Sequence, residues 1–161
     1  MDPDIREYRP SDEEPIVALS LRAWAPVFAS MEQVLGHDIN FRLHGDWRQY
    51  QEKEVRDTLA DSAMRVWVAE ADRGVTGFVA ARVVDPKRLI GEIFILAVDP
   101  DDQRRGIGTA LTKYATSWLR RSGMRVAMIG TGGDPGHAPA RRVYEKANYS
   151  LMPIARYFKA L

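Results

Sequence analysis

The stretch EIFILAVDPDDQRRGIG, residues Glu92–Gly108, predicts a strand, a turn and the start of a helix in direct succession. Residues 93–98 are all apolar, which predicts a strand buried on both faces. Pro100 cannot donate to a strand ladder, so the strand should end just before it. After Gly106 the apolar residues recur at helical spacing as far as Leu119. The stretch therefore predicts a strand–turn–helix unit, around which the rest of the chain is organised.

The turn in this unit has the features of a phosphate site. Free backbone N–H groups and the positive end of the helix dipole converge at the start of a helix, which suits a phosphate. Gly106 and Gly108 would let the backbone approach closely, and Arg104 and Arg105 add positive charge. The two glycines could also serve the turn geometry alone. The glycine loop at residues 131–136 lacks the G-x-x-x-x-G-K-[ST] pattern, so a nucleoside triphosphate site is not expected there.

Three parts of the sequence carry a resemblance to a known family. The segment QRRGIG, residues 103–108, resembles the Q/R-x-x-G-x-G/A pyrophosphate-binding signature of the GNAT superfamily of acyl-CoA-dependent N-acyltransferases. Glu92 stands eleven residues before Gln103, where many such enzymes carry a catalytic carboxylate. The segment ARRVYEKANY, residues 140–149, is similar to the family's A-x-x-x-Y-x-x-x-G-F segment, with Asn148 where the family prefers glycine. The resemblance spans roughly residues 65–149.

The resemblance implies one α/β domain over residues 1–161. Its central sheet would be mixed, mostly antiparallel and twisted, flanked by helices, with parallel strands splayed at the coenzyme A site. It also implies acetyl-CoA as the acyl donor and no metal. The pantetheine arm would pair with the central strand like an extra strand, the backbone N–H of Leu96 would polarise the thioester carbonyl, and Val98 would pair further along. The residues expected to bind the cofactor are Leu96, Ala97, Val98, Gln103, Arg104, Arg105, Gly106, Ile107, Gly108, Thr109, Ala140 and Tyr144.

Two side chains are candidates for the proton transfers. An alkyl ammonium has a pKa of about 10, so a general base must take its proton. Glu92 is the one acid in its apolar strand, and a period of two places it on the same face as Leu96. Burial would raise its pKa and suit it to this role, although a strand-start acid can also lie in solvent or in a salt bridge. Tyr144 matches the family's general-acid tyrosine, which protonates the leaving thiolate; a core aromatic on a short helix is the alternative.

The acceptor is expected over the N-terminal helices. Candidates for an aromatic and acidic wall there, which could equally belong to the core, are Trp24, Phe28, Glu32, Asp38 and Trp47. His137, in the glycine loop, could bind substrate, relay a proton or cap the loop. His37 and His44 show no metal-ligand spacing with it.

Composition limits the classes of function. The 161 residues fit one domain, and the absence of cysteine excludes disulfides, thiolate metal sites and a cysteinyl acyl-enzyme. The acidic start at Met1–Asp4 and the lack of a membrane-length apolar run argue against a signal peptide or a spanning helix, so we expect a cytoplasmic protein. There is no basic run of the kind that nucleic-acid arms use.

The two halves of the chain carry opposite charge. Residues 1–80 hold 9 Lys/Arg and 15 Asp/Glu, a net of −6, whereas residues 81–161 hold 14 and 7, a net of +7. Chance and solvated helix faces would explain this, but so would a basic half that receives a polyanion and an acidic half that receives a cation. Coenzyme A with an amine fits the second interpretation.

Patterning along the chain predicts the remaining elements. Helices are expected from Ser11 (a capping box with Glu14) to about Trp24, over 27–35 after a break or kink at Pro26, and over 46–60, 108–121 and 139–146. Strands are expected at 5–9, 65–70, 75–84, 90–98, 125–130 and 151–158, with a loop at 37–45. The 125–130 strand should follow a right-handed parallel crossover, and Asn148 could give the last helix a left-handed exit.

Together these features predict an N-acetyltransferase that transfers an acetyl group from acetyl-CoA directly to a primary amine of a small molecule or a protein N-terminus. No nucleic-acid or membrane partner is expected, and a homodimer is one option for its assembly. The alternative is a non-catalytic acyl-CoA-binding or sensing module.

Overall fold

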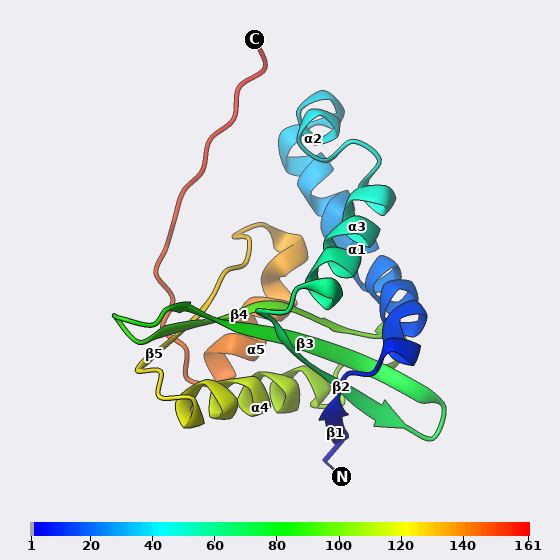
Figure 1. Ribbon diagram of the computed structural model, residues 1–161. Coiled ribbons are helices and arrows are strands. Elements are labelled where there is room, and N and C mark those ends of the chain that lie inside the picture. Colours follow the sequence, from blue (N-terminus) through cyan, green and yellow to red (C-terminus); the bar gives the residue numbers. More distant parts are fainter. Residues whose placement is uncertain (1) are drawn as a thin grey trace.

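The computed structural model describes residues 2–161 and contains a five-stranded mixed sheet with helices on both faces (Figure 1). Met1, and with it the first residue of the acidic N-terminal stretch, lies outside the described residues. In spatial order the strands are β1 (Asp4–Glu7), β2 (Arg65–Ala71), β3 (Gly74–Asp85), β4 (Ile90–Val98) and β5 (Val126–Ile129). Neighbouring strands are antiparallel except for the parallel pair β4 and β5. The predicted α/β class and mostly antiparallel sheet are confirmed.

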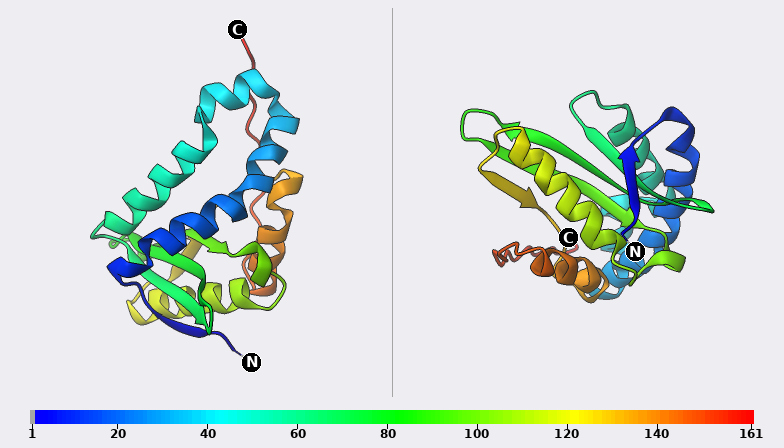
Figure 2. Two further views of the ribbon diagram at one scale, coloured as in Figure 1. Left: turned by 90° about the vertical axis from the view of Figure 1, so that its right-hand side faces the viewer. Right: turned by 90° about the horizontal axis from the view of Figure 1, so that it is seen from below.

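The helices form two layers (Figure 2). One layer holds α1 (Glu13–Leu35), α2 (His37–His44) and α3 (Trp47–Ala60). The other holds α4 (Ile107–Arg121), with α5 (Ala138–Lys146) packed beside it. Short 3₁₀ turns at residues 10–12, 100–102 and 135–137 precede α1, the α4 turn and α5. No helix formed by residues 2–161 has both the length and the apolar character needed to cross a membrane.

The sheet separates two apolar clusters. The cluster under α1 and α3 holds Ile16, Val17, Leu19, Val55, Met64, Val68, Phe78, Ala80, Ile95 and Ala97. The cluster under α4 holds Trp67, Ala69, Val79, Ala81, Ile93, Val98, Ile107, Leu111, Ala115 and Leu119. Both clusters include residues of β4, as expected for a strand buried on both faces.

The N-terminal helices differ from the prediction in three places. Pro26 lies inside one continuous helix α1, although its ring removes a hydrogen bond to residue 22; burial of Phe28 beyond it helps to hold the helix together. Residues 37–44 form α2 and not a loop, bounded by Gly36 and Gly45 at positive φ. The predicted Ser11 cap is also wrong, because residues 10–12 form a 3₁₀ turn.

Asp12 holds the turn before α1, although its side chain caps no N–H group of that helix. Its Oδ2 accepts the Arg9 backbone N–H at 2.8 Å, and Arg6 donates to both of its oxygens at 2.8 and 3.0 Å. These hydrogen bonds from Arg6 lower the pKa of Asp12.

The C-terminal half follows the prediction except at its end. The crossover from β4 through α4 to β5 gives the expected parallel pair, and Asn148 has the expected left-handed backbone, with φ 64°. Residues 151–158, however, form no strand: the chain has no regular secondary structure after α5, and its large apolar side chains there are exposed. A strand needs a hydrogen-bonded neighbour, and residues 151–158 are paired with no strand of the described sheet.

Candidate active site

Strand β4 contains a bulge that changes which side chains share a face. Ala80 of β3 lies opposite Ile95, and Ala81 lies opposite Ile93, so Phe94 is an extra residue. As a result Ile93 and Leu96 pack on the α4 side, whereas Phe94 and Ile95 both pack on the α1/α3 side. By alternation from Ile93, Glu92 also faces the α1/α3 side. The prediction that Glu92 and Leu96 share a face is therefore wrong, because the bulge inserts one residue between them.

The C-terminal part of β4 has a free edge. β5 pairs only with Ile90–Ile93, so beyond this point β4 has β3 as its only neighbour in the sheet of the described residues. The Asp99 N–H donates to the Thr76 carbonyl of β3 at 2.8 Å. Along an antiparallel ladder, residues that hydrogen-bond to the neighbouring strand alternate with residues that do not, so Ala97 also bonds to β3 and Leu96 and Val98 do not. The backbone groups of Leu96 and Val98 then point away from β3, towards the open edge. An extended chain laid against this edge would find an acceptor and a donor at every second residue.

The turn after β4 presents uncapped backbone N–H groups. Arg104 and Gly106 have left-handed φ angles of 63° and 82°, so backbone amides in this turn can converge on an anion. α4 begins at Ile107, and its N-cap, Gly106, has no side chain that could accept from the first turn. The N–H groups of residues 107–109 therefore lack intrahelical partners. The Gln103 side chain donates to the Val98 carbonyl at 3.2 Å and joins the turn to the end of β4.

Ion pairs hold this turn in place. Asp102, which is buried, accepts from Arg105 at 3.2 Å and also pairs with Arg73 from the β2–β3 turn. Arg22 of α1 binds Asp99 at 2.9 Å and Asp101 at 2.8 Å. The Arg105 guanidinium thus has a structural partner, whereas the Arg104 side chain is exposed beside the uncapped turn.

Helix α5 packs against the start of α4. A Cβ placed on Gly108 would lie 3.7 Å from Val143 of α5 and 3.7 Å from Val98 of β4. Tyr144 and Ala140, both half-buried, lie on the same helix as Val143. Position 108 is thus close to both the end of β4 and the helix that carries Tyr144.

The Tyr144 hydroxyl is a weaker acid than that of a solvent-exposed tyrosine. Burial, with a smaller contribution from Tyr149, raises the pKa of Tyr144 to about 12. Among residues 2–161 its hydroxyl has no hydrogen-bond partner, whereas the neighbouring Tyr149 hydroxyl is bound to Thr116 Oγ1 at 2.6 Å. Tyr144 thus has an uncommitted O–H group, and Tyr149 does not.

Glu92 is engaged in an ion pair. Its Oε2 lies 3.0 Å from both Nε and a terminal nitrogen of Arg82, and the Arg82 guanidinium stacks 4.8 Å from the centre of the Phe94 ring. The Glu92 side chain is 18% exposed. Both features predicted for this residue as alternatives, a partly buried carboxylate and a salt bridge, are present together.

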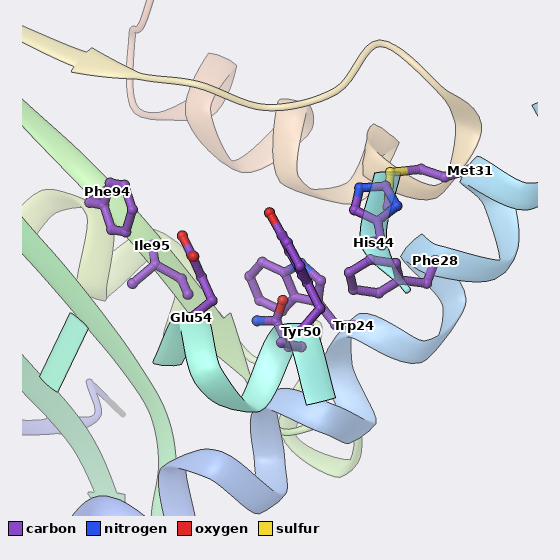
Figure 3. Close-up of a pocket in the computed structure, with 9 residues that line it drawn as sticks. Trp24, Phe28, Met31, His44, Tyr50, Glu54, Phe94 and Ile95 are labelled. Carbon is purple, nitrogen blue, oxygen red and sulfur yellow. The ribbon is translucent and has the colours of Figure 1, made fainter. Parts of the chain in front are cut away.

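A cavity of about 210 Å³ opens between the N-terminal helices and the β4 bulge (Figure 3). Its lining is Trp24, Phe28, Met31, His44, Tyr50, Gln51, Glu54, Phe94 and Ile95. Glu54 is the one acid in this lining, and its carboxylate lies beside Phe94 and Ile95 in Figure 3. The Gln51 amide nitrogen is buried without a hydrogen-bond partner in the described chain. We call this cavity the aromatic pocket.

The predicted acceptor wall is only partly assembled. Trp24 and Phe28 line the aromatic pocket, and Phe28 stacks on Trp47 with ring centres 5.0 Å apart. Trp47 and Glu32 line a separate, more open cavity of about 630 Å³ on the other side of Phe28. Asp38 lines neither cavity and pairs with Arg42 at 3.2 Å.

Three residues of α3 that line the aromatic pocket, Tyr50, Gln51 and Glu54, were not predicted from the sequence. The predicted helix 46–60 contained them, but its charged composition gave no sign of which residues face the sheet. Their spacing places them on one face of α3, where Val55 and Thr58 are buried.

His137 belongs to a loop-anchoring cluster. Its Nδ1 pairs with Asp134 Oδ1, while Asp134 Oδ2 accepts from Ser30 of α1 at 2.7 Å. Burial disfavours the charged form of Asp134, but the bonds with Ser30 and His137 outweigh it and lower its pKa. The Gly136 N–H donates to Ser30 Oγ at 2.9 Å, and a Cβ on Gly136 would lie 2.5 Å from the Ser30 Cβ. The cluster therefore fastens the glycine loop to α1. His137 lines neither cavity.

The histidines and acids of residues 2–161 form no group of three that could hold a metal ion.

Comparisons with known proteins agree on one family. Residues 31–149 match the Acetyltransferase (GNAT) family. Mycothiol acetyltransferase of Saccharomonospora viridis is 30% identical over 151 residues, which cover 88% of this chain and 43% of that protein. Mycothiol acetyltransferase of Amycolatopsis mediterranei is 31% identical over 153 residues, covering 85% and 48%. The chain thus spans about half the length of these curated relatives.

Solved structures share the fold at low sequence identity. A mutant form of the BH1408 protein from Bacillus halodurans has a TM-score of 0.70 at 16% identity, over 98% of this chain and 99% of that one. An aminoglycoside N-acetyltransferase in complex with CoA has a TM-score of 0.60 at 15% identity, over 98% and 93%. An aminoglycoside acetyltransferase from a soil metagenomic sample, in complex with sisomicin, has a TM-score of 0.59 at 16% identity, over 98% and 95%. The family match covers most of the residues that build the strand–turn–helix unit, the aromatic pocket and α5, and the chain belongs to the Acetyltransferase (GNAT) family.

Proposed function

We propose that this chain transfers an acetyl group from acetyl-CoA directly to a primary amine of a small cationic molecule. The observation that carries the proposal is the free edge of β4 beyond Ile93, which ends beside the uncapped start of α4. An extended thioester arm and a pyrophosphate are the ligand parts that fit a free strand edge followed by a convergent set of N–H groups.

In this proposal the pyrophosphate lies on the N–H groups of residues 106–109, with Arg104 adding charge. The pantetheine arm pairs with the backbone of Leu96 and Val98, and the thioester carbonyl accepts a hydrogen bond from Leu96 N–H. That bond strengthens as negative charge develops on the carbonyl oxygen during attack. Ala97, Ala140 and Tyr144 would line the arm, and Arg105 would act mainly by fixing the turn through Asp102.

The acceptor lies in the aromatic pocket. Aromatic rings and one carboxylate are the groups that bind an ammonium, through cation–π contacts and an ion pair with Glu54. The pocket also borders the β4 bulge, which brings its occupant next to the open edge of the strand. The names of the relatives, mycothiol acetyltransferase and aminoglycoside acetyltransferase, further support a small-molecule acceptor. A cavity of about 210 Å³ suits a small amine better than a folded protein's N-terminus.

The chemistry requires one base and one acid. The amine nitrogen attacks the thioester carbon, a C–N bond forms, the C–S bond breaks, and the amine loses a proton. We assign Glu92 as the base, acting through water from the same side of the sheet as the pocket. We assign Tyr144 as the acid that protonates the leaving thiolate, since its hydroxyl is uncommitted.

The Arg82–Glu92 ion pair favours a second candidate, a non-catalytic acyl-CoA-binding module. In this ion pair the carboxylate of the proposed base is already bound to a guanidinium. The two candidates differ in amine-dependent release of the CoA thiol, which a thiol reagent can follow without background because the chain has no cysteine. Release with a panel of small polyamines and amino sugars supports the enzyme. Binding of acetyl-CoA without release for every amine supports the second candidate.

Glu54→Gln should raise KM for a cationic amine by about 10-fold or more, with kcat much less changed, because a hydrogen bond to a charged group is worth roughly 1.5–3 kcal/mol. Glu52→Gln is the matched control, because Glu52 lies on the same helix outside the pocket. Steady-state kinetics with the best amine of the panel checks both variants. Equal KM values for the two variants would remove Glu54 from acceptor binding.

Glu92→Gln should reduce the rate at neutral pH by roughly 10²–10⁴-fold, the usual contribution of a general base. Raising the pH should restore part of the rate, because more of the amine is then already neutral. The measurement is a pH–rate profile, with thermal melting to check that loss of the Arg82 pair leaves the fold intact. A wild-type rate at neutral pH would assign the base to a group other than Glu92.

A further inference from the structure

Arg82 of β3 lies directly opposite Glu92 of β4, the proposed base. Side chains alternate between the two faces of a strand. Ala80 packs in the cluster under α1 and α3 and Ala81 in the cluster under α4, so Arg82 is on the same face as Ala80. Glu92 faces that side too, and the Arg82 and Glu92 side chains are 35% and 18% exposed. The guanidinium and the carboxylate therefore meet on the face of the sheet that borders the aromatic pocket.

The ion pair uses only one of the two carboxylate oxygens of Glu92. Arg82 Nε donates to Oε2 at 3.0 Å, and a terminal nitrogen of Arg82 lies 3.0 Å from the same oxygen. Oε1 accepts no hydrogen bond from residues 2–161. Within the described chain, the only fully buried side-chain nitrogen or oxygen atoms that lack a partner are Ser20 Oγ and Gln51 Nε2, so Oε1 is open to solvent. The carboxylate is thus held by one oxygen and free at the other.

The Phe94 ring holds the guanidinium in this position. The centre of that ring lies 4.8 Å from the guanidinium carbon of Arg82. Phe94 also lines the aromatic pocket, as Figure 3 shows. A planar guanidinium can stack on a ring with its face and donate hydrogen bonds from its edge at the same time. Arg82 therefore joins the carboxylate of Glu92 to the wall of the proposed acceptor site.

We propose that Arg82 is a positioning residue for the acetyl transfer, which holds Glu92 so that Oε1 receives the proton of the amine through water. This inference rests on the proposed function. A water molecule takes the proton from the amine nitrogen and passes one of its own to Oε1, which leaves Glu92 as a neutral carboxylic acid until the proton is released to solvent. Arg82 remains a guanidinium throughout and exchanges no proton. On this account the ion pair prepares the base for catalysis and does not block it.

Arg82→Met tests this role, because it removes every donor and keeps most of the apolar stem. We expect kcat to fall about 10- to 100-fold, because a base that is free to turn spends less time in the productive geometry. KM for the amine and for acetyl-CoA should stay within about twofold of wild type. Arg82→Lys keeps the charge but cannot stack and donate from two nitrogens together, so it should recover only part of the loss. Arg88→Met is the matched control and should leave kcat unchanged, since Arg88 lies in the same hairpin with its side chain 81% exposed.

A double-mutant cycle with Glu92→Gln separates this role from that of a purely structural ion pair. If Arg82 acts through Glu92, Arg82→Met should change kcat by less than about twofold in the Glu92→Gln background. In a wild-type chain that acetylates an amine, three results would each overturn this inference and leave the proposed function standing: an unchanged kcat in Arg82→Met, full recovery in Arg82→Lys, or the same loss in both backgrounds. A wild-type chain that acetylates no amine would overturn the proposed function, and this inference with it.

Discussion

Gly108→Glu should weaken acetyl-CoA binding by at least about 100-fold, because it places a negative charge at the proposed pyrophosphate position. The site offers an anion the N–H groups of residues 106–109 and the positive end of α4, and a carboxylate on the second residue of that helix would occupy it. Calorimetric titration with acetyl-CoA and with CoA measures the loss directly.

Gly108→Ala is the matched control for this prediction. The structure has room for a methyl group at this position, since the nearest atoms to an added Cβ, on Val143 and Val98, lie 3.7 Å away. We expect the alanine variant to bind acetyl-CoA within a few-fold of wild type, and both variants to melt at temperatures close to wild type. If the glutamate variant bound as well as the alanine variant, the turn would not be the anion site.

Tyr144→Phe should reduce kcat by roughly 10²-fold or more while acetyl-CoA affinity stays near wild type, because proton donation to the thiolate occurs only in the transition state. The variant removes one hydroxyl that has no partner within residues 2–161, so packing should be little disturbed. An acetyl thioester of a more acidic thiol needs less help from an acid and should rescue the variant more than the wild type. The measurement is kcat with both thioesters.

Tyr149→Phe is the control. It removes the hydroxyl of the ring next to Tyr144, and that hydroxyl is already hydrogen-bonded to Thr116. We expect its kcat to stay close to wild type. Since burial raises the pKa of Tyr144 to about 12, this phenol stays protonated between about pH 7 and 9. A rise in rate over that pH range would therefore come from deprotonation of the amine or of the base. Normal turnover of the Tyr144 variant with acetyl-CoA would make this residue a packing aromatic.

The strand–turn–helix unit was predictable because each of its parts has a local pattern. The apolar run ending before Pro100 gave the bounds of β4, and the spacing after Gly106 gave α4 to within one residue. The anion site that we propose in the turn also has a local pattern, since a site built from backbone N–H groups depends on glycines and basic residues close together in sequence.

The parts that could not be predicted depend on contacts distant in sequence. A period of two cannot show the bulge at Phe94, which is created by its pairing with β3 and which turns Glu92 away from the face of Leu96. The aromatic pocket collects residues from α1, α2, α3 and β4, so no local pattern marks Glu54 as part of it. Residues 151–158 have a strand pattern, but a strand forms only where a hydrogen-bonded neighbour lies beside it, and a local pattern cannot show that.

Direct acetyl transfer to a small amine is tested most directly by mass spectrometry of both the amine and the protein after incubation with acetyl-CoA. The proposal predicts an acetyl group on the nitrogen of at least one small cationic amine, in an amount that exceeds the protein many-fold, and none on the protein itself. Acetyl-CoA binding without an acetylated amine from any member of the panel would contradict the proposal and would leave the chain as an acyl-CoA-binding module.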